Sequence, residues 1–415
     1  MTSKTKTTTT KEETPPALVP KLRFPEFRES QEWDRMPLAS ICNVLQGYGF
    51  PEAIQGKANG KYPFCKVSDI SRAVAENAGV LAEAANYVDE AEVGMLRAKP
   101  IPPGATVFAK IGEALRLNRR AYVLNSCLID NNAVALKGID GLANDYFVYS
   151  LSQLIDLNKH CGGAVPSVNK TTLEQIQVCV PSLNEQQKIA ECLSSVDELM
   201  AAQARKVEAL KTHKKGLMQQ LFPREGETQP RLRFPEFQNA GEWVAKSLGA
   251  IAPLQRGFDL PADEIRPGNV PIVYSNGPKG FHARGMAKGP GIVTGRSGTI
   301  GKIHFIESGD YWPHNTSLWV TSFEGHIPKF VYYLYESIRF LRFASGSGVP
   351  TLNRNDAHSF ATSVPPHTDE QQRIASCLSS LDALITAETQ KLEALKTHKK
   401  GLMQQLFPTA EEVEA

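Results

Sequence analysis

The chain has 415 residues, of which 41% are hydrophobic and 22% are charged, which is typical of a folded protein of about two to three globular domains. Lysine and arginine exceed aspartate and glutamate by only two, so any binding to nucleic acid must be local or shared with a partner. No apolar run reaches the roughly 18 residues of a membrane span. The seven cysteines form no CxxC pair, which argues against a disulfide framework or a structural zinc site.

The first segment, residues 1–19, is rich in threonine and lysine and lacks the apolar stretch of a signal peptide. We therefore expect a disordered tail here and a protein that stays in the cytoplasm. A second short tail is expected at 409–415.

Two pairs of segments repeat along the chain. Residues 20–33 (PKLRFPEF, then EW) recur as residues 230–243 (PRLRFPEF, then EW). Residues 185–223 match residues 370–408 at 29 of 39 positions. Self-similarity of this kind predicts a duplicated architecture.

The regions between the repeats, 34–181 and 244–366, share little sequence, but short likenesses survive. Residues 108–112 resemble 294–298, and GAVPSVNK resembles GSGVPTLNR once Val165-Pro166 is laid on Val349-Pro350. We expect one fold with two different surfaces.

Short apolar runs bounded by Gly, Pro and Asn predict strands in both middle regions. These runs lie at 105–109, 121–124, 132–136, 271–275, 291–295, 302–306 and 318–320. A helix is expected in each region, at 145–159 and at 329–343. Each middle region is thus predicted to be a compact α+β domain.

The second repeat predicts two long helices of another kind. Asn184 and Asp369 are placed as N-caps, with Gln187 and Gln372 three positions later. Apolar residues then recur at steps of four and three for nearly five heptads, which favours an antiparallel coiled coil. The expected divisions are a tail at 1–19, domain 1 at 20–181, helix 1 at 182–223, linker and domain 2 at 224–366, helix 2 at 367–408 and a tail at 409–415.

Polar residues interrupt the heptads at Gln203 and Lys214, and at the equivalent Glu388 and Lys399. We prefer the antiparallel register that sets Lys214 against Glu388 and Gln203 against Lys399, because buried polar residues often mark register. The register one heptad away sets Lys214 against Leu381. A third possibility is that both lysines reach solvent and specify nothing.

Motifs for catalysis are absent. The segment 295–302 (GRSGTIGK) fails the spacing of a phosphate-binding loop and is typical of a tight β-turn. The nine histidines form no HxxxH or HExxH pair, so no metal site is predicted.

Each sequence feature that indicates DNA binding is weak by itself, but several of them point to the same function. Arg116 to Arg120 place three guanidinium groups in five residues, and further basic residues flank the Gly-rich turns of the second region. Arginine and asparagine on rigid turns can contact base edges, whereas lysine mainly positions phosphates. The candidate DNA-binding residues are Lys110, Arg116, Asn118, Arg119, Arg120, Lys170, Arg256, Lys279, Arg296, Ser297, Thr299, Lys302 and Arg354.

The order RFPEF…EW, variable region, EQQ-led helix ending in KKGLMQQLFP, and then the same again resembles the specificity subunit of type I restriction-modification systems. The resemblance implies two α+β target recognition domains separated by two antiparallel helices, each domain reading half of an asymmetric double-stranded DNA site. It implies two modification subunits that carry S-adenosylmethionine, with no cofactor in this chain. It leaves open whether restriction subunits that use ATP and magnesium also join.

The duplicated architecture alone also indicates a similar function. Two copies of one fold with different surfaces, held apart by a rod, suit two unlike half-sites at a fixed spacing. The alternative is a coiled-coil scaffold that joins proteins and does not contact DNA. The divergence of the middle regions beside nearly identical helices favours the DNA reader.

Overall fold

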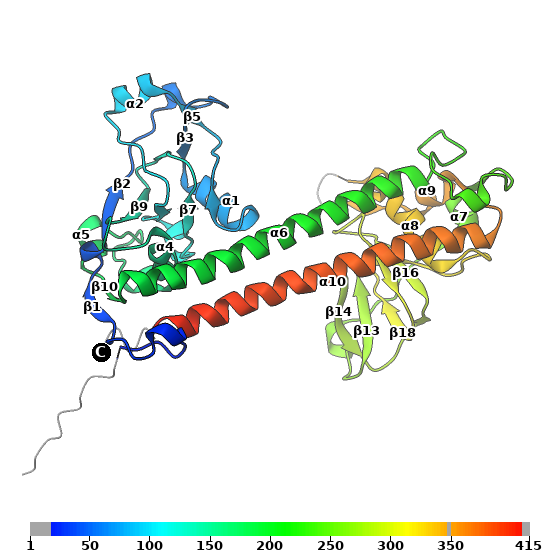
Figure 1. Ribbon diagram of the computed structural model, residues 1–415. Helices are drawn as coiled ribbons and strands as arrows, with labels where there is room; N and C mark the ends of the chain where they lie inside the picture. Colours follow the sequence, from blue (N-terminus) through cyan, green and yellow to red (C-terminus); the bar gives the residue numbers. More distant parts are fainter. Residues whose placement is uncertain (1–17, 347–349, 409–415) are drawn as a thin grey trace, which may run out of the picture. The chain divides into compact units, whose positions relative to one another are not determined.

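The computed structural model describes residues 18–346 and 350–408 and divides into two compact units (Figure 1). The first unit contains Met1–Arg205 and Gln390–Ala415, and the second contains Lys206–Thr389. Each unit holds one middle region and a part of each repeated helix, so the units divide the chain within the helices. Most of the tail expected at 1–19, all of that at 409–415, and Val349 lie outside the described residues.

The repeated segments form α6 (Leu183–Leu221) and α10 (Thr368–Leu406). Within each unit, a part of α6 and a part of α10 run side by side in opposite directions (Figure 1). The predicted N-caps are wrong, because Asn184 and Asp369 lie inside the first turns. Ser182 precedes α6, and its Oγ accepts a hydrogen bond from the Glu185 N–H at 3.4 Å. No helix among the described residues is long and apolar enough to cross a membrane.

The domain of the first unit has a main sheet in the order β2-β9-β6-β7-β4, a small sheet β5-β3-β8, and a ribbon β1-β10. Its strands are β1 (Asp34–Pro37), β2 (Cys42–Gln46), β3 (Tyr62–Cys65), β4 (Val80–Leu81), β5 (Tyr87–Val88), β6 (Thr106–Ala109), β7 (Ala121–Val123), β8 (Leu128–Ile129), β9 (Ala133–Gly138) and β10 (Gln177–Val180). Its helices are α1 (Val67–Glu76), α2 (Glu90–Leu96), α3 (Glu113–Arg116), α4 (Asp145–Leu154) and α5 (Lys170–Gln175).

The domain of the second unit repeats this plan, with sheets β12-β19-β16-β17 and β14-β13-β18-β15 and the ribbon β11-β22. Its strands are β11 (Val244–Ser247), β12 (Leu254–Arg256), β13 (Val270–Tyr274), β14 (Gly277–His282), β15 (Ala287–Lys288), β16 (Gly291–Gly295), β17 (Ile303–Ile306), β18 (Asp310–Pro313), β19 (Ser317–Val320), β20 (Ala344–Ser345), β21 (Thr351–Leu352) and β22 (Ala361–Val364). Its helices are α7 (Leu248–Ile251), α8 (Pro328–Ser337) and α9 (Arg354–Ser359).

The two main sheets have the same order, with β2, β9, β6 and β7 in the places of β12, β19, β16 and β17. Both small sheets contain a parallel pair, β3 with β8 and β13 with β18. The prediction of one α+β fold used twice is therefore confirmed, and the seven apolar runs form strands as expected. The two predicted helices are α4 and α8, each followed after a break by a short 3-10 helix, Leu157–Lys159 or Phe340–Phe343.

Each unit has a core that joins its domain to both long helices. In the first unit, Trp33 packs edge-on against Phe147 of α4 and Phe407 at the end of α10, with ring centroids 6.1 and 5.9 Å away. In the second unit, Phe330 of α8 packs edge-on against Trp243, with ring centroids 6.4 Å apart, and lies tilted against Phe222 at 5.6 Å. The repeated EW and QQLFP motifs thus supply aromatic rings to both cores, which bury large apolar areas.

Candidate nucleic-acid interface

Four chain segments meet in the domain of the first unit: 46–48 at the end of β2, 110–112 after β6, 129–132 after β8, and 166–170 before α5. Four backbone hydrogen bonds join them: Tyr48 N–H to Ile129 O (2.9 Å), Lys110 N–H to Asn132 O (2.9 Å), Val168 N–H to Lys110 O (2.9 Å) and Gly112 N–H to Pro166 O (2.8 Å). We name these segments the first junction. Backbone pairing holds their side chains in a fixed arrangement.

The second unit contains a second junction, made of segments 256–258, 296–298, 313–316 and 350–354. The equivalent bonds are Phe258 N–H to Pro313 O (2.8 Å), Arg296 N–H to Thr316 O (2.9 Å), Leu352 N–H to Arg296 O (2.7 Å) and Gly298 N–H to Pro350 O (3.2 Å). The expected likenesses of 108–112 to 294–298 and of Pro166 to Pro350 are therefore confirmed by the backbone.

A glycine at the same place in each junction lets two segments approach closely. A Cβ on Gly47 would lie 1.8 Å from the carbonyl oxygen of Asp130, and one on Gly257 would lie 2.2 Å from that of His314. No side chain fits at such distances. Both glycines are thus required by the junction.

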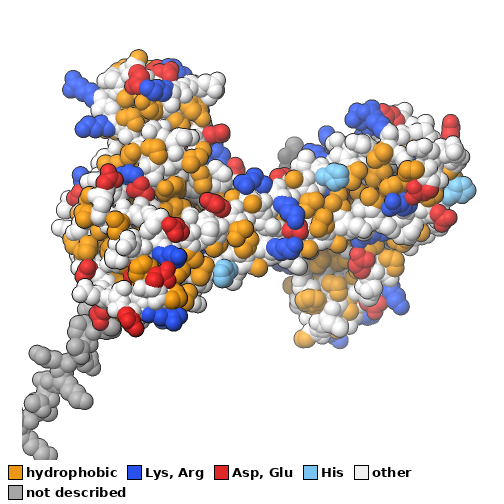
Figure 2. Space-filling model, viewed as in Figure 1, with side chains coloured by type: hydrophobic (Ala, Val, Ile, Leu, Met, Phe, Trp, Pro, Cys, Tyr) orange, Lys and Arg blue, Asp and Glu red, His pale blue; other side chains and the backbone are white. Residues whose placement is uncertain are grey.

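The side chains carried by the two junctions differ, although the backbone is shared. The equivalent pairs are Gln46 and Arg256, Lys110 and Arg296, Ile111 and Ser297, Asp130 and His314, Asn132 and Thr316, and Lys170 and Arg354. Six predicted DNA-binding residues lie in the junctions: Lys110, Lys170, Arg256, Arg296, Ser297 and Arg354. The face of the molecule in Figure 2 shows acidic and basic side chains intermixed, so basic clusters such as these are local features.

In the first junction, the Lys110 ammonium donates a hydrogen bond to the Gln46 side chain, and burial lowers the pKa of Lys110. Lys170 is exposed at the start of α5 and lies 3.5 Å from Glu174. Burial raises the pKa of Asp130 above its ordinary value. This junction therefore presents amide, ammonium and carboxylate groups.

In the second junction, Arg256 lies 3.4 Å from Asp259, and Arg296 donates to the backbone oxygen of Asn315 at 3.5 Å. The His314 ring packs on Tyr274 with centroids 4.2 Å apart, and burial lowers the pKa of His314. Because Arg256 stands where the first junction has Gln46, and His314 where it has Asp130, this junction is the more basic of the two.

The turn that carries Ser297, Thr299 and Lys302 joins the antiparallel strands β16 and β17. A phosphate-binding loop leads instead into a helix. Residues 296–302 form a loop between two strands that is longer than the predicted tight β-turn. The Thr294 hydroxyl donates to Lys302 O at 3.0 Å, which closes the turn, and the Lys302 side chain is exposed. Lys279 is also exposed, on β14 and outside the second junction.

The prediction for Arg120 is wrong. Its side chain is only 4% exposed, and its guanidinium lies over the Phe108 ring, 4.3 Å from the centroid. It donates to the Asn118 side chain at 3.1 Å and to Ile155 O at 3.2 Å. Arg120 therefore supports the core between β6 and α4 and cannot reach DNA.

Asn118 is also turned inward, in a left-handed conformation with φ of 51°. Its amide donates to Ile155 O at 3.0 Å, and its oxygen accepts from the Leu157 N–H at 3.2 Å. Arg116 is exposed beside Glu113, and Arg119 is half-buried. In the cluster at 116–120, Asn118 and Arg120 therefore have structural contacts, whereas Arg116 lies on the surface and Arg119 is half-buried.

The sequence profile of the type I restriction modification DNA specificity domain matches residues 30–212 and 240–397, which is most of the chain. The chain belongs to this family. The type I restriction enzyme MjaVIII specificity subunit of Methanocaldococcus jannaschii is 22% identical over 92% of this chain and 93% of its own.

Solved structures agree on the fold of a specificity subunit. The type I restriction-modification S subunit from M. genitalium, 16% identical, covers 94% of this chain and 99% of its own, with a TM-score of 0.63. A chain from a study of complex assembly and conformational transition of the type I R-M system, 14% identical, covers 91% and 97%, with a TM-score of 0.54.

The helix register that we preferred from the sequence, with Lys214 against Glu388 and Gln203 against Lys399, is wrong for this specificity subunit. Lys214 pairs with Asp382 at 2.8 Å and Glu336 at 3.3 Å, Lys399 pairs with Asp197 at 2.7 Å, and Glu388 pairs with Lys206 at 3.0 Å. Because Asp382 is next to Leu381, the structure lies close to the register one heptad away. Lys214 and Lys399 thus pair with acidic residues that flank the seam between the helices, and Lys214 also pairs with one on α8.

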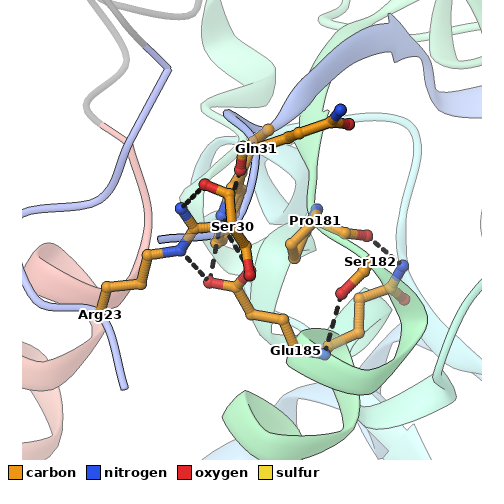
Figure 3. Close-up of polar contacts among 8 residues, drawn as sticks. Arg23, Ser30, Gln31, Pro181, Ser182 and Glu185 are labelled. Carbon is orange, nitrogen blue, oxygen red and sulfur yellow. Dashed lines mark hydrogen bonds and ion pairs between the residues drawn. The ribbon is translucent and has the colours of Figure 1, made fainter. Parts of the chain in front are cut away.

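The family motifs also build a buried contact that sequence reasoning missed. Glu185 of α6, 1% exposed, accepts two hydrogen bonds from Arg23, at 2.8 and 2.7 Å (Figure 3). It also accepts one from the Trp33 indole at 3.3 Å. Arg23 also donates to the backbone oxygens of Ser30 and Gln31, both at 2.9 Å. Pairing with Glu185 raises the pKa of Arg23. We name Arg23, Trp33 and Glu185 the first lock.

The second lock consists of Arg233, Trp243 and Glu370. Arg233 donates twice to Glu370, each at 2.7 Å, and Trp243 donates once at 3.0 Å. The repeat of RFPEF, EW and EQQ could have suggested that these residues meet, since they recur together. Each lock ties the start of a long helix to the segment that leads into the recognition domain.

Proposed function

We propose that this specificity subunit is the non-catalytic DNA reader of a type I restriction-modification complex, with each junction reading one half of a bipartite, asymmetric site. The observation that supports this is the shared backbone of the junctions and their different side chains. Two equal frames with unlike surfaces suit two unlike half-sites, whereas two equal surfaces would suit a palindrome.

The junction side chains divide by chemistry. Lys170 and Arg354 are exposed at the first position of α5 and α9, and they suit phosphate contacts. Gln46 has both a donor and an acceptor for base edges, and Arg256 and Arg296 have donors. The proposed role needs no cofactor in this chain.

We further propose that the chain assembles with two modification subunits, which hold S-adenosylmethionine and methylate the DNA in the cytoplasm. The helix ends at 208–223 and 393–408 are identical in sequence, which supports two equivalent partners.

Domain replacement tests this function. Residues 34–181 are exchanged for the equivalent domain of a related specificity subunit, and the methylated sequence is read from the DNA of cells that express the complex. We expect one half of the site to change and the other to remain. A change in both halves, or in neither, would contradict the proposal, as would methyl transfer by the purified chain alone.

A further inference from the structure

The second junction contains a polar network that the first lacks. Asp259 Oδ1 accepts hydrogen bonds from both the Arg256 guanidinium, at 3.4 Å, and the Asn315 amide. The backbone oxygen of Asn315 in turn accepts from Arg296. Three loops thus bring two arginines, an asparagine and a carboxylate together.

Stability does not explain this network. The side chain of Asp259 is 71% exposed and that of Arg256 is 50% exposed, and an ion pair so open to water contributes little to folding. A carboxylate beside a DNA-reading arginine would, however, limit the rotamers of that arginine. An oriented guanidinium can donate two parallel hydrogen bonds to O6 and N7 of guanine.

The first junction has different groups at the same places. Gln46 stands at the position of Arg256 and accepts a hydrogen bond from Lys110. Gly49 stands at the position of Asp259. A Cβ on Gly49 would meet no atom within 4 Å, so space does not account for the missing side chain. The difference therefore points to what each junction recognises.

We propose that Arg256, positioned by Asp259, selects a guanine in the half-site read by the second domain. Arg256 contacts the base, and Asp259 acts only through Arg256. This inference rests on the proposed function and adds the base and the residues that choose it. The first junction, with Gln46 and Gly49, makes no such selection.

The test uses the complete complex with its modification subunits. The methylated sequence is compared for wild type, Arg256→Gln, Arg256→Lys, Asp259→Asn and the matched control Arg231→Gln, an exposed arginine paired with Glu227 outside the junction. We expect Arg256→Gln to relax one guanine position in one half-site by roughly 5- to 150-fold. Arg256→Lys, which keeps the charge but loses the planar guanidinium, and Asp259→Asn should relax the same position less. Arg231→Gln should leave the sequence unchanged.

Binding to modified DNA separates a base contact from a structural effect. Replacing the selected guanine with 7-deazaguanine removes the N7 acceptor, so wild type should lose affinity for this probe and Arg256→Gln should not distinguish the two probes. An unchanged methylated sequence in Arg256→Gln would overturn the inference, as would equal affinity of wild type for the two probes. If wild type methylates no bipartite site at all, the proposed function itself fails.

Discussion

The locks and the junctions are built on opposite principles. The two locks contain the same three residue types with nearly the same distances, so both units attach a domain to a long helix in one way. The two junctions share their backbone hydrogen bonds and a required glycine, Gly47 or Gly257, but most of their other residues differ. Constant side chains thus attach each domain to its helix, whereas the proposed reading sites combine a constant backbone with variable side chains.

Breaking a lock should have the largest effect. Glu185→Ala leaves the buried Arg23 without its carboxylate, and such unpaired charges cost about 3 to 5 kcal/mol. Urea denaturation of the purified chain should show this loss in the transition of the first unit. Glu26→Ala, which removes an exposed ion pair with Lys188, is the control and should change nothing measurable. Equal effects of the two variants would show that the lock carries no special weight.

Arg120 lies in a variable domain and yet has a structural role, as the lock residues do. Arg120→Ala removes a ring contact and hydrogen bonds to Asn118 and Ile155, so we expect a loss of about 2 to 4 kcal/mol in unfolding free energy. DNA affinity of the folded protein should not change. Arg116→Ala, at the exposed end of the same cluster, should be neutral for stability. Weaker DNA binding by folded Arg120→Ala would contradict this assignment.

The smallest effect on stability is expected at the junctions. Lys170→Ala and Arg354→Ala remove exposed cations, and their unfolding should match that of wild type. Binding should weaken to a similar extent on every DNA sequence, and the salt dependence of log K should fall by about one in slope. Titrations of the complex at several salt concentrations will measure this. A change of sequence preference would instead make these residues base readers.

Much of the fold could be predicted from sequence, because strands, helices and the repeat leave local patterns. The runs 105–109 and 291–295 are apolar and bounded by turns, and both are central strands. The likeness of 108–112 to 294–298 predicted a shared fold, and the structure places both segments in the junctions, where the backbone path is the same. Weak patterns such as β12 and β14 escaped prediction.

The remaining errors concern contacts between distant segments. From the sequence, Arg120 is predicted to be a surface cation. Only the fold shows that it packs against Phe108 and Ile155. The register failed because the lysines pair with acids that flank the seam: Lys214 pairs with Asp382, and Lys399 pairs with Asp197. A heptad pattern can specify a seam, but not which flanking acids pair with the polar residues inside it.

The two equivalent locks also affect how such a gene can change. A recognition domain copied from one unit into the other would find an arginine, a tryptophan and a glutamate at the same attachment points. Both helices also end in the identical run EALKTHKKGLMQQLFP, so the helix ends that pack against the two domains are alike as well. Whole reading surfaces can therefore be exchanged between genes in one step, without waiting for each contact in the core to evolve again.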